Sequence, residues 1–204
     1  MVFRKCRNLE LITQDYKLDY SLEYMTITEC PNFVSFPKGG FSAPSLTNFD
    51  ICKLENLKSL PECMHTLFPS LTCLTIDSCP QLEVFSNGGL PPSLKFMVLC
   101  GCSNLLLSSL KWALGINTSL KSLRIGNVDV ESFPDQGLLP RSLTSLRIND
   151  CVNLKKLDYK GLCHLSSLED LILNGCPSLQ CLPVEGLPKT ISALQVTDCL
   201  LLKQ

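Results

Sequence analysis

The 204-residue chain has little charge and few of the residues that active sites use most. Only 18% of its residues are charged, the net charge is −1, and it has two histidines and one tryptophan. Neither half carries the basic excess typical of nucleic-acid binding or of attachment to an anionic membrane. No apolar stretch reaches the roughly 18 residues of a bilayer span, and the start lacks the apolar centre of a signal peptide. We therefore expect no nucleic-acid partner, no membrane span and a cytoplasmic location.

Enzyme and cofactor motifs are also missing from the sequence. It contains no G-x-x-x-x-G-K-[ST], no G-x-G-x-x-G, no H-E-x-x-H and no G-x-S-x-G. Two thiol–imidazole pairs occur, Cys63 with His65 and Cys163 with His164. Both pairs lie in connecting segments whose apolar residues are needed to cover a core. We interpret them as packing residues, and we predict a protein that is not an enzyme and holds no cofactor.

The sequence is instead dominated by a repeat. The phrase L-x-x-L-x-I-x-x-C-x-x-L-x-x-L/F-P returns every 23 to 26 residues. From the second repeat on, an apolar residue stands two positions before each aliphatic centre, which is typical of a short strand with one buried face. Strands this short, separated by roughly twenty residues, can pair only in parallel. The centres of the repeats are Phe3, Ile27, Ile51, Ile76, Leu99, Ile125, Ile148, Leu173 and Val196.

This period predicts an α/β solenoid, a right-handed superhelix of about nine coils that forms one domain over residues 1–204, with the first coil truncated. Segments such as 88–94 (GGLPPSL) combine Gly, Pro and Ser and leave no room for a helix. Longer segments at 62–71, 105–120 and 159–168 could hold one or two helical turns. We therefore expect a curved molecule with a parallel sheet on the concave face and a mostly irregular, short-helical convex side.

The middle of the chain is its least regular part. The longest step, 26 residues, leads to the coil centred on Ile125, and the tryptophan, Trp112, precedes that coil. Leu107, Leu110 and Leu114 surround Trp112 at helical spacing. We expect Trp112 to pack on the convex side, with an exposed anchor for a partner as the alternative.

Thirteen cysteines raise the question of disulfides and metal sites. Leu54 and Val128 fill the repeated cysteine slot in two coils, so the slot accepts a small apolar core residue. The odd total and the identical geometry favour reduced thiols, with disulfides between neighbouring coils as the alternative. No C-x-x-C occurs and the two histidines lie 99 positions apart, so we predict no metal site. The cysteines in the slot, three residues after each centre, are Cys6, Cys30, Cys79, Cys102, Cys151, Cys176 and Cys199.

Three repeats carry a resemblance to a known family. SLTCLTIDSCPQLEVF, SLTSLRINDCVNLKKL and SLEDLILNGCPSLQCLP, joined by GLPPSL-type connections, resemble the C-terminal leucine-rich repeats of plant nucleotide-binding disease-resistance proteins of the coiled-coil class. The resemblance covers essentially the whole chain, although Leu200 stands where the family more usually has Pro. It implies a module that binds a pathogen effector or a host protein and restrains a nucleotide-binding domain. That domain is not in this sequence, so we expect the chain to be part of a longer or truncated product.

Two other classes of protein remain open. The repeats of an extracellular receptor would fit the period, but the G-x-I-P turn of plant extracellular repeats is missing and one glycosylation sequon occurs, at 117–119. The substrate-recognition repeats of F-box ubiquitin-ligase adaptors have similar cysteine-bearing strands. Those repeats usually continue with I-T-D-x-G-L rather than with L-x-x-L-P.

Outward-facing strand positions are the candidate binding residues, because the buried leucines serve to hold the coils together. Phe96 and Val98 place apolar groups outward on one strand, which favours a covering partner. Arg124 and Arg147 stack like charges on adjacent strands, which is mildly destabilising without a ligand. Aromatic residues and arginine are typical of binding hot spots. The alternative is an ordinary surface, neutralised in part by Asp170 or Asp150. The predicted partner-binding residues are Phe96, Val98, Arg124, Arg147, Asp170 and Ile172.

Neither end of the repeat array has a polar cap. The core of a solenoid continues to its first and last coils unless a capping segment covers it. We therefore expect apolar core positions to be exposed at both ends of this chain.

Overall fold

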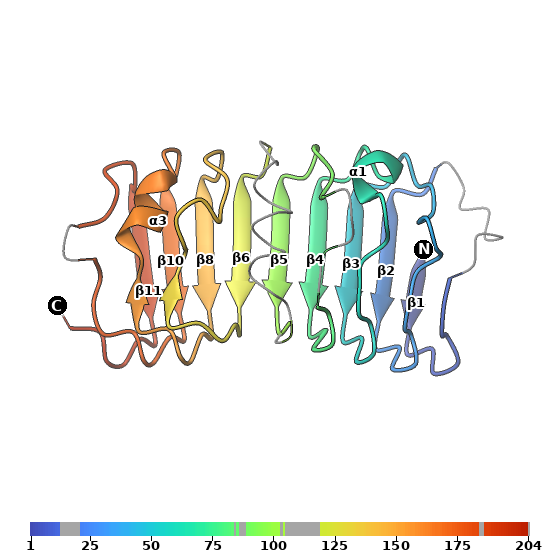
Figure 1. Ribbon diagram of the computed structural model, residues 1–204, viewed down its shortest axis with the longest axis horizontal. Helices are drawn as coiled ribbons and strands as arrows, with labels where there is room; N and C mark the ends of the chain where they lie inside the picture. Colours follow the sequence, from blue (N-terminus) through green and yellow to red (C-terminus); the bar gives the residue numbers. More distant parts are fainter. Residues whose placement is uncertain are drawn as a thin grey trace.

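The protein is a parallel β-solenoid in the computed structural model, which describes residues 1–12, 21–83, 85, 89–102, 104, 119–183 and 186–203 (Figure 1). Nine strands form one sheet and follow one another in chain order. Each strand pairs in parallel with its neighbours, as its spacing in the sequence predicts. The strands are β1 (Val2–Arg4), β2 (Tyr24–Thr28), β3 (Asn48–Cys52), β4 (Cys73–Asp77), β5 (Phe96–Cys100), β6 (Ser122–Gly126), β8 (Ser145–Asn149), β10 (Asp170–Asn174) and β11 (Ala193–Thr197).

The register joins repeat centre to repeat centre along the whole sheet. Phe3 lies opposite Ile27 and Ile27 opposite Ile51, and the pattern continues to Leu173 opposite Val196. A slip of one residue would turn every apolar side chain of a strand outward, so the buried face fixes this register. The predicted strands and their alignment are confirmed.

The number of complete coils is slightly lower than the nine we expected. A complete turn runs from one strand to the next, so nine strands in series enclose fewer than nine turns. The chain also ends at Gln204, soon after β11.

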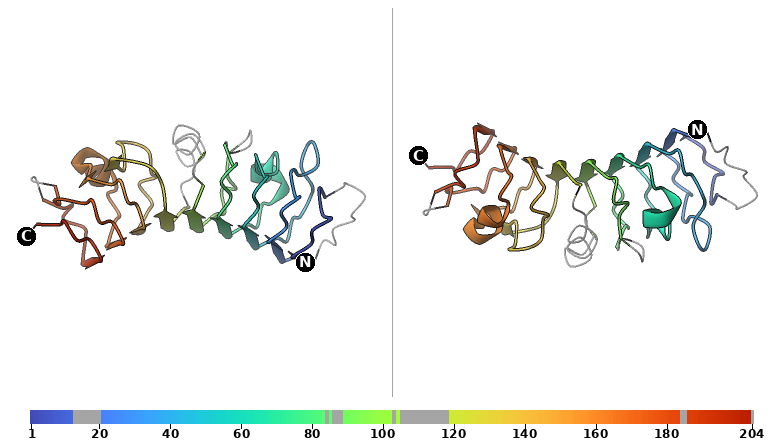
Figure 2. Two further views of the ribbon diagram at one scale, coloured as in Figure 1. Left: turned by 90° about the horizontal axis from the view of Figure 1, so that it is seen from below. Right: turned by 90° about the horizontal axis from the view of Figure 1, so that it is seen from above.

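The sheet is curved, and its outer face is the concave one, as predicted. In both views of Figure 2 the two ends of the sheet curve away from the side that carries the helices, so the outer face of the sheet is concave. That convex side carries α1 (Met64–Leu67) and α3 (Tyr159–His164), which lie in two of the three segments expected to hold helical turns. It also carries a small second sheet of β7 (Ser132–Phe133) and β9 (Lys156–Leu157). Residues 105–118, with Trp112 and most of the third segment, lie outside the described residues.

The core runs continuously along the inner face of the sheet, because each coil stacks its aliphatic residues on those of the next. The inward residues of β2 to β10 are almost fully buried. The first coils are filled by an aromatic cluster, in which the Phe41 and Phe68 rings lie 4.9 Å apart between centroids. Such ring pairs contribute roughly 0.5–1.5 kcal/mol beyond their area burial. The other members of the cluster are Phe33, Phe36 and Phe49.

A left-handed residue follows every strand of the main sheet. It stands two positions after each repeat centre, with φ between 50° and 64°. Before the last coil its N–H continues the hydrogen-bond ladder by one step, as when Lys53 N donates to Asp77 O at 2.8 Å. This turn directs the chain away from the sheet at the same place in each coil. The residues are Lys5, Glu29, Lys53, Ser78, Gly101, Asn127, Asp150, Gly175 and Asp198.

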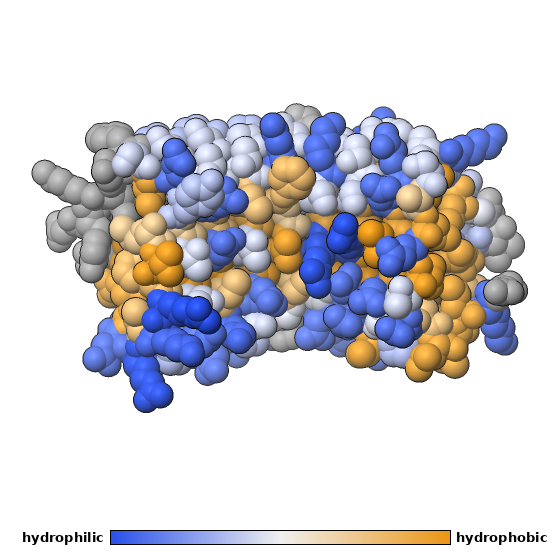
Figure 3. Space-filling view, turned by 180° about the vertical axis from the view of Figure 1, so that it is seen from behind, coloured by the Kyte–Doolittle hydropathy of each residue, from blue (hydrophilic) through white to orange (hydrophobic). Residues whose placement is uncertain are grey.

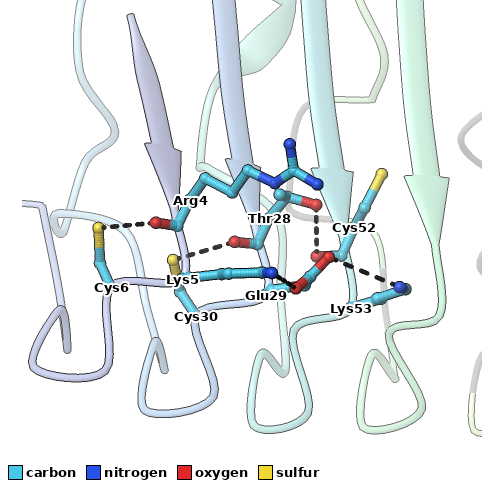
Figure 4. A network of polar contacts seen from close by, with 8 residues as sticks. All are labelled: Arg4, Lys5, Cys6, Thr28, Glu29, Cys30, Cys52 and Lys53. Atoms are coloured by element: carbon cyan, nitrogen blue, oxygen red, sulfur yellow. Dashed lines mark hydrogen bonds and ion pairs between the residues drawn. The ribbon is translucent and has the colours of Figure 1, made fainter.

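The repeated cysteines pack beneath this turn. Each of the seven thiols donates to the backbone carbonyl two residues earlier, over distances from 3.3 Å for Cys151 to 3.7 Å for Cys176. Figure 4 shows two such contacts, Cys6 to Arg4 O and Cys30 to Thr28 O. All thirteen cysteines are free thiols. Burial raises the pKa of Cys79 to about 11 and that of Cys102 to about 12, so at neutral pH both thiols keep the proton that they donate.

Ion pairs link the left-handed residues of the first three coils. Glu29 contacts Lys5 at 3.7 Å and Lys53 at 3.6 Å, as drawn in Figure 4. Both lysines are well exposed, so each pair contributes at most about 1 kcal/mol.

Candidate interaction surface

The outer face of the sheet presents its side chains in three straight rows, because every strand pairs in the same register. Figure 3 looks onto this face and shows hydrophilic and hydrophobic groups intermixed over its centre, with a broad hydrophobic area at the β11 end. From β1 to β11 the middle row reads Val2, Thr26, Asp50, Thr75, Val98, Arg124, Arg147, Ile172 and Gln195.

All six residues predicted from the sequence lie on this face, on four adjacent strands. Phe96 and Val98 belong to β5, Arg124 to β6, and Arg147 to β8, while β10 carries the remaining two, Asp170 and Ile172. The side chain of Phe96 is 51% exposed. The structure thus provides an apolar strip on β5 beside two arginines.

Arg124 and Arg147 lie directly opposite each other on adjacent strands, which are about 4.8 Å apart. Both are exposed. Among the described residues neither arginine forms an ion pair, so neither Asp150 nor Asp170 neutralises them by direct contact. Because the two guanidinium groups repel each other, a negatively charged ligand placed between them would relieve that repulsion.

Gly126, in the lower row of the face, is one of the residues that line a depression. It stands between Cys100 and Asn149, where a Cβ atom would lie 3.0 Å from the Cys100 sulfur and 3.0 Å from the Asn149 carbonyl oxygen. These two neighbours already fill the space that a Cβ atom would need, so Gly126 allows them to pack closely beside a depression of about 670 Å³. Asp77 and Asp150 line this depression together with Val98 and Arg124.

Arg124 affects the pKa of its neighbour Cys100, which also lines this depression. Burial raises the pKa of the Cys100 thiol, and the nearby Arg124 guanidinium opposes this shift. The Cys100 thiol therefore stays protonated at neutral pH, and the charges of the depression are those of the two carboxylates and one guanidinium.

A second depression, of about 310 Å³, adjoins the first at Arg124. We call it the arginine hollow. None of the described residues that line it is acidic. They are Arg124, Arg147, Asn149, Ile172, Asn174, Gln195 and Thr197.

The hollows separate the six predicted residues into two groups. Val98, Arg124, Arg147 and Ile172 line one or both of them, whereas Phe96 and Asp170 lie on the same face outside both linings. The sequence prediction did not include the amide side chains of the arginine hollow, of which Asn149 and Asn174 occupy the same slot in consecutive coils. The recurrence of asparagine in this slot is the feature of the sequence that could have indicated these residues.

A solved structure shares this architecture. The leucine-rich repeat domain of the type III effector XopL matches with a TM-score of 0.58 and 22% sequence identity, over 87% of this chain and 69% of that one. At this level of identity the likeness shows the fold alone. The fold is that of a leucine-rich repeat, as predicted.

Two proteins of Arabidopsis thaliana are similar in sequence as well. One, named as a disease resistance protein, is 38% identical over 171 residues. The other, SUPPRESSOR OF npr1-1, CONSTITUTIVE 1, is 32% identical over 200 residues. The chain belongs to the leucine-rich repeat regions of plant disease-resistance proteins. The matches cover 83% and 89% of this repeat region.

The repeat region corresponds to a small part of these relatives, 12% and 13% of their respective lengths. No protein-family model matches its sequence. In the part of the chain that the structure describes, no helix has the length and apolar character needed to cross a membrane. Nor do the described residues gather three or more His, Cys, Asp or Glu side chains in an arrangement that could hold a metal ion.

Proposed function

We propose that this leucine-rich repeat region is a non-catalytic recognition module that binds a protein partner on the concave face of its sheet. The partner would be a pathogen effector or a host protein, and the repeats would contribute to autoinhibition of a nucleotide-binding domain in the same or a longer protein. The name of one Arabidopsis relative, a disease resistance protein, supports a role in plant defence. Neither relative's name supports an F-box adaptor or an extracellular receptor.

One observation carries the proposal: two exposed arginines without an ion-pair partner among the described residues stand beside the exposed Phe96 and the half-buried Val98 on the concave face. Without a bound partner, like charges on adjacent strands do not stabilise the sheet. A partner that covers the face gains from both groups, because aromatic and arginine side chains supply most of the energy of protein interfaces.

A cytoplasmic location is part of this proposal. Thirteen free cysteines, several of them one coil apart, fit a compartment in which thiols are kept reduced. The coils from residue 1 to residue 204 would act there as one recognition unit.

The proposal is tested by reversing the charge of the arginine pair in the full-length protein from which the repeats come. We expect the double variant Arg124→Glu and Arg147→Glu to lose pathogen recognition or to become active without a pathogen, measured as a cell-death response in leaves. Lys156→Glu with Lys160→Glu is the matched control, since these exposed lysines lie on the convex side. If the arginine variant accumulates normally and responds like the parent protein, the concave face is not the recognition surface.

A further inference from the structure

The arginine hollow has the charge of an anion site. The described residues of its lining contribute two guanidinium groups and no carboxylate, so together they carry a formal charge of +2. Neither arginine has an ion-pair partner among the described residues. Because arginine remains protonated at every relevant pH, this charge is permanent.

The hollow also offers many hydrogen-bond donors. Beside the arginines, its lining includes three amide side chains, Asn149, Asn174 and Gln195. A guanidinium has five N–H groups and an amide has two. A carboxylate has two oxygens to accept them, whereas a phosphate ester has three and carries a charge of about −1.5 to −2. The hollow therefore fits a dianionic phosphate better than a single carboxylate in both charge and number of acceptors.

Apolar groups flank the arginine pair on both sides along the sheet. Val98 lies opposite Arg124 on β5, and Ile172 lies opposite Arg147 on β10. A bound segment that crosses the strands would thus meet an apolar surface before and after the charged centre. This favours a peptide as the source of the phosphate over the free ion.

We propose that the arginine hollow binds a phosphorylated side chain of the protein partner, with apolar residues of the partner resting on Val98 and Ile172. The inference rests on the proposed function, in which the concave face binds a protein. Recognition would then depend on a modification of the partner, because the unmodified hydroxyl would leave both guanidinium groups without an ion-pair partner.

The test is a titration of the 204-residue chain with acetyl-Leu-phosphoserine-Leu-amide, whose leucines can rest on the apolar flanks, followed by NMR of the arginine side-chain N–H signals. We expect saturable shifts of these signals. The glutamate and serine versions of the peptide should bind about tenfold more weakly or not at all, because they carry less charge and fewer acceptors. Inorganic phosphate should bind more weakly than the phosphopeptide, since it gains nothing from the apolar flanks. Equal affinity for the glutamate peptide would overturn the proposal in favour of a site for acidic residues.

Variants connect the binding to the hollow. Arg147→Gln should weaken phosphopeptide binding at least about tenfold, whereas Arg147→Lys, which keeps the charge but loses the planar fork, should weaken it less. Arg141→Gln is the control, because Arg141 is exposed and does not line the hollow. Asn174→Ala is a second, smaller change, expected to weaken binding severalfold. Undiminished binding by folded Arg147→Gln and Asn174→Ala proteins would place the phosphate elsewhere.

The pH dependence separates phosphate from carboxylate. The second pKa of a phosphate ester is about 6, and no residue that lines the hollow titrates between about pH 5 and pH 7.5. Phosphopeptide affinity should therefore fall severalfold when the pH is lowered over this range. Unchanged affinity would mean that the second negative charge makes no contribution, contrary to the proposal.

The two proposals fail in different ways. If charge reversal abolishes recognition in the full-length protein but no phosphopeptide binds the isolated chain, the concave face is the recognition surface and the phosphate inference is wrong. If phosphopeptides bind in the hollow but charge reversal leaves recognition unchanged, the hollow is a phosphate site and the proposed function is wrong.

Discussion

At the scale of single residues, the left-handed position after each strand shows a conflict between local and long-range forces. Gly101 and Gly175 adopt positive φ without strain, and Asn or Asp tolerates it in three other coils. Lysine, glutamate and serine at the other positions have no such preference. They are held there because the N–H of the turn must continue the ladder to the next coil.

Lys53 allows this strain to be measured. Lys53→Gly should be more stable than Lys53→Ala by about 1 kcal/mol, because a Cβ atom at φ 54° costs about that much. Both variants lose the contact with Glu29 equally, so their difference isolates the backbone effect. Urea unfolding followed by circular dichroism gives the two free energies of unfolding.

Lys58 is the matched control for this comparison, since it is exposed and is not among the residues with positive φ. There alanine should be the more stable of the two replacements by about 0.5–1 kcal/mol, the usual order outside such turns. The same order at position 53 would show that its turn is unstrained.

The sequence predicted the role of the cysteine slot but not the left-handed turn that precedes it. A position that accepts Cys, Leu or Val has to be small and apolar, and Cys79 and Leu54 are indeed fully buried. The turn has no such common chemistry, because Lys5, Glu29 and Ser78 share no backbone preference. Its geometry is set by hydrogen bonds to the next coil, which become visible once the coils are stacked.

At the scale of elements, the strands follow from the sequence more directly than the convex segments do. Each strand has its own apolar alternation, whereas the short helices depend on what they pack against. Helix α3 is one example: Asp158 caps it by accepting a hydrogen bond from Gly161 N at 2.7 Å. Gly161 is buried, and a Cβ atom added to it would collide with the carbonyl oxygen of Pro134.

Gly161→Ala should therefore destabilise the protein by about 1–3 kcal/mol, the usual cost of overpacking. Helix propensity alone predicts the opposite, a gain of about 1 kcal/mol. Thermal unfolding measured by circular dichroism shows whether the substitution destabilises or stabilises the protein.

Lys160→Ala, at the exposed neighbouring position of the same helix, serves as the control for this substitution. It should change the free energy of unfolding by less than about 0.5 kcal/mol. A Gly161→Ala protein as stable as the parent would mean that α3 moves freely away from Pro134.

At the scale of the whole molecule, stability depends on neighbouring coils. Leu171 and Leu173 of β10 are fully buried between two strands, whereas the equivalent Leu194 and Val196 of β11 are 44% and 37% exposed. The expected exposure of core positions is thus confirmed at the last coil. The loss of one stacking neighbour removes about half of the contacts that hold a coil in place.

Hydrogen exchange should reveal this gradient in the 204-residue chain. We expect the hydrogen-bonded amides of β11 to exchange at least about tenfold faster than those of β6, because the last coil can open without disrupting the others. Mass spectrometry of peptic fragments after timed exposure to heavy water provides the measurement. Equal protection in β6 and β11 would show instead that the solenoid opens as a single unit.

The candidate surface was predictable only in part. Strict alternation in each strand was enough to place Phe96, Val98, Arg124, Arg147, Asp170 and Ile172 on the outer face. The two hollows were not predictable, because they depend on the side chains that surround a gap. Gly126 is an example: that Cys100 and Asn149 fill the space beside it becomes visible when the three strands lie side by side.

The uniform register has a consequence for how such genes can change. Each junction between strands joins the same slots of two coils, so duplicating or deleting one whole coil rebuilds an ordinary junction. Such an event would displace the arginine pair along the molecule by one strand spacing, about 4.8 Å, relative to the residues beyond the duplicated or deleted coil. Unequal crossing-over could therefore alter the distances between binding groups in discrete steps while leaving the chemistry of each group intact.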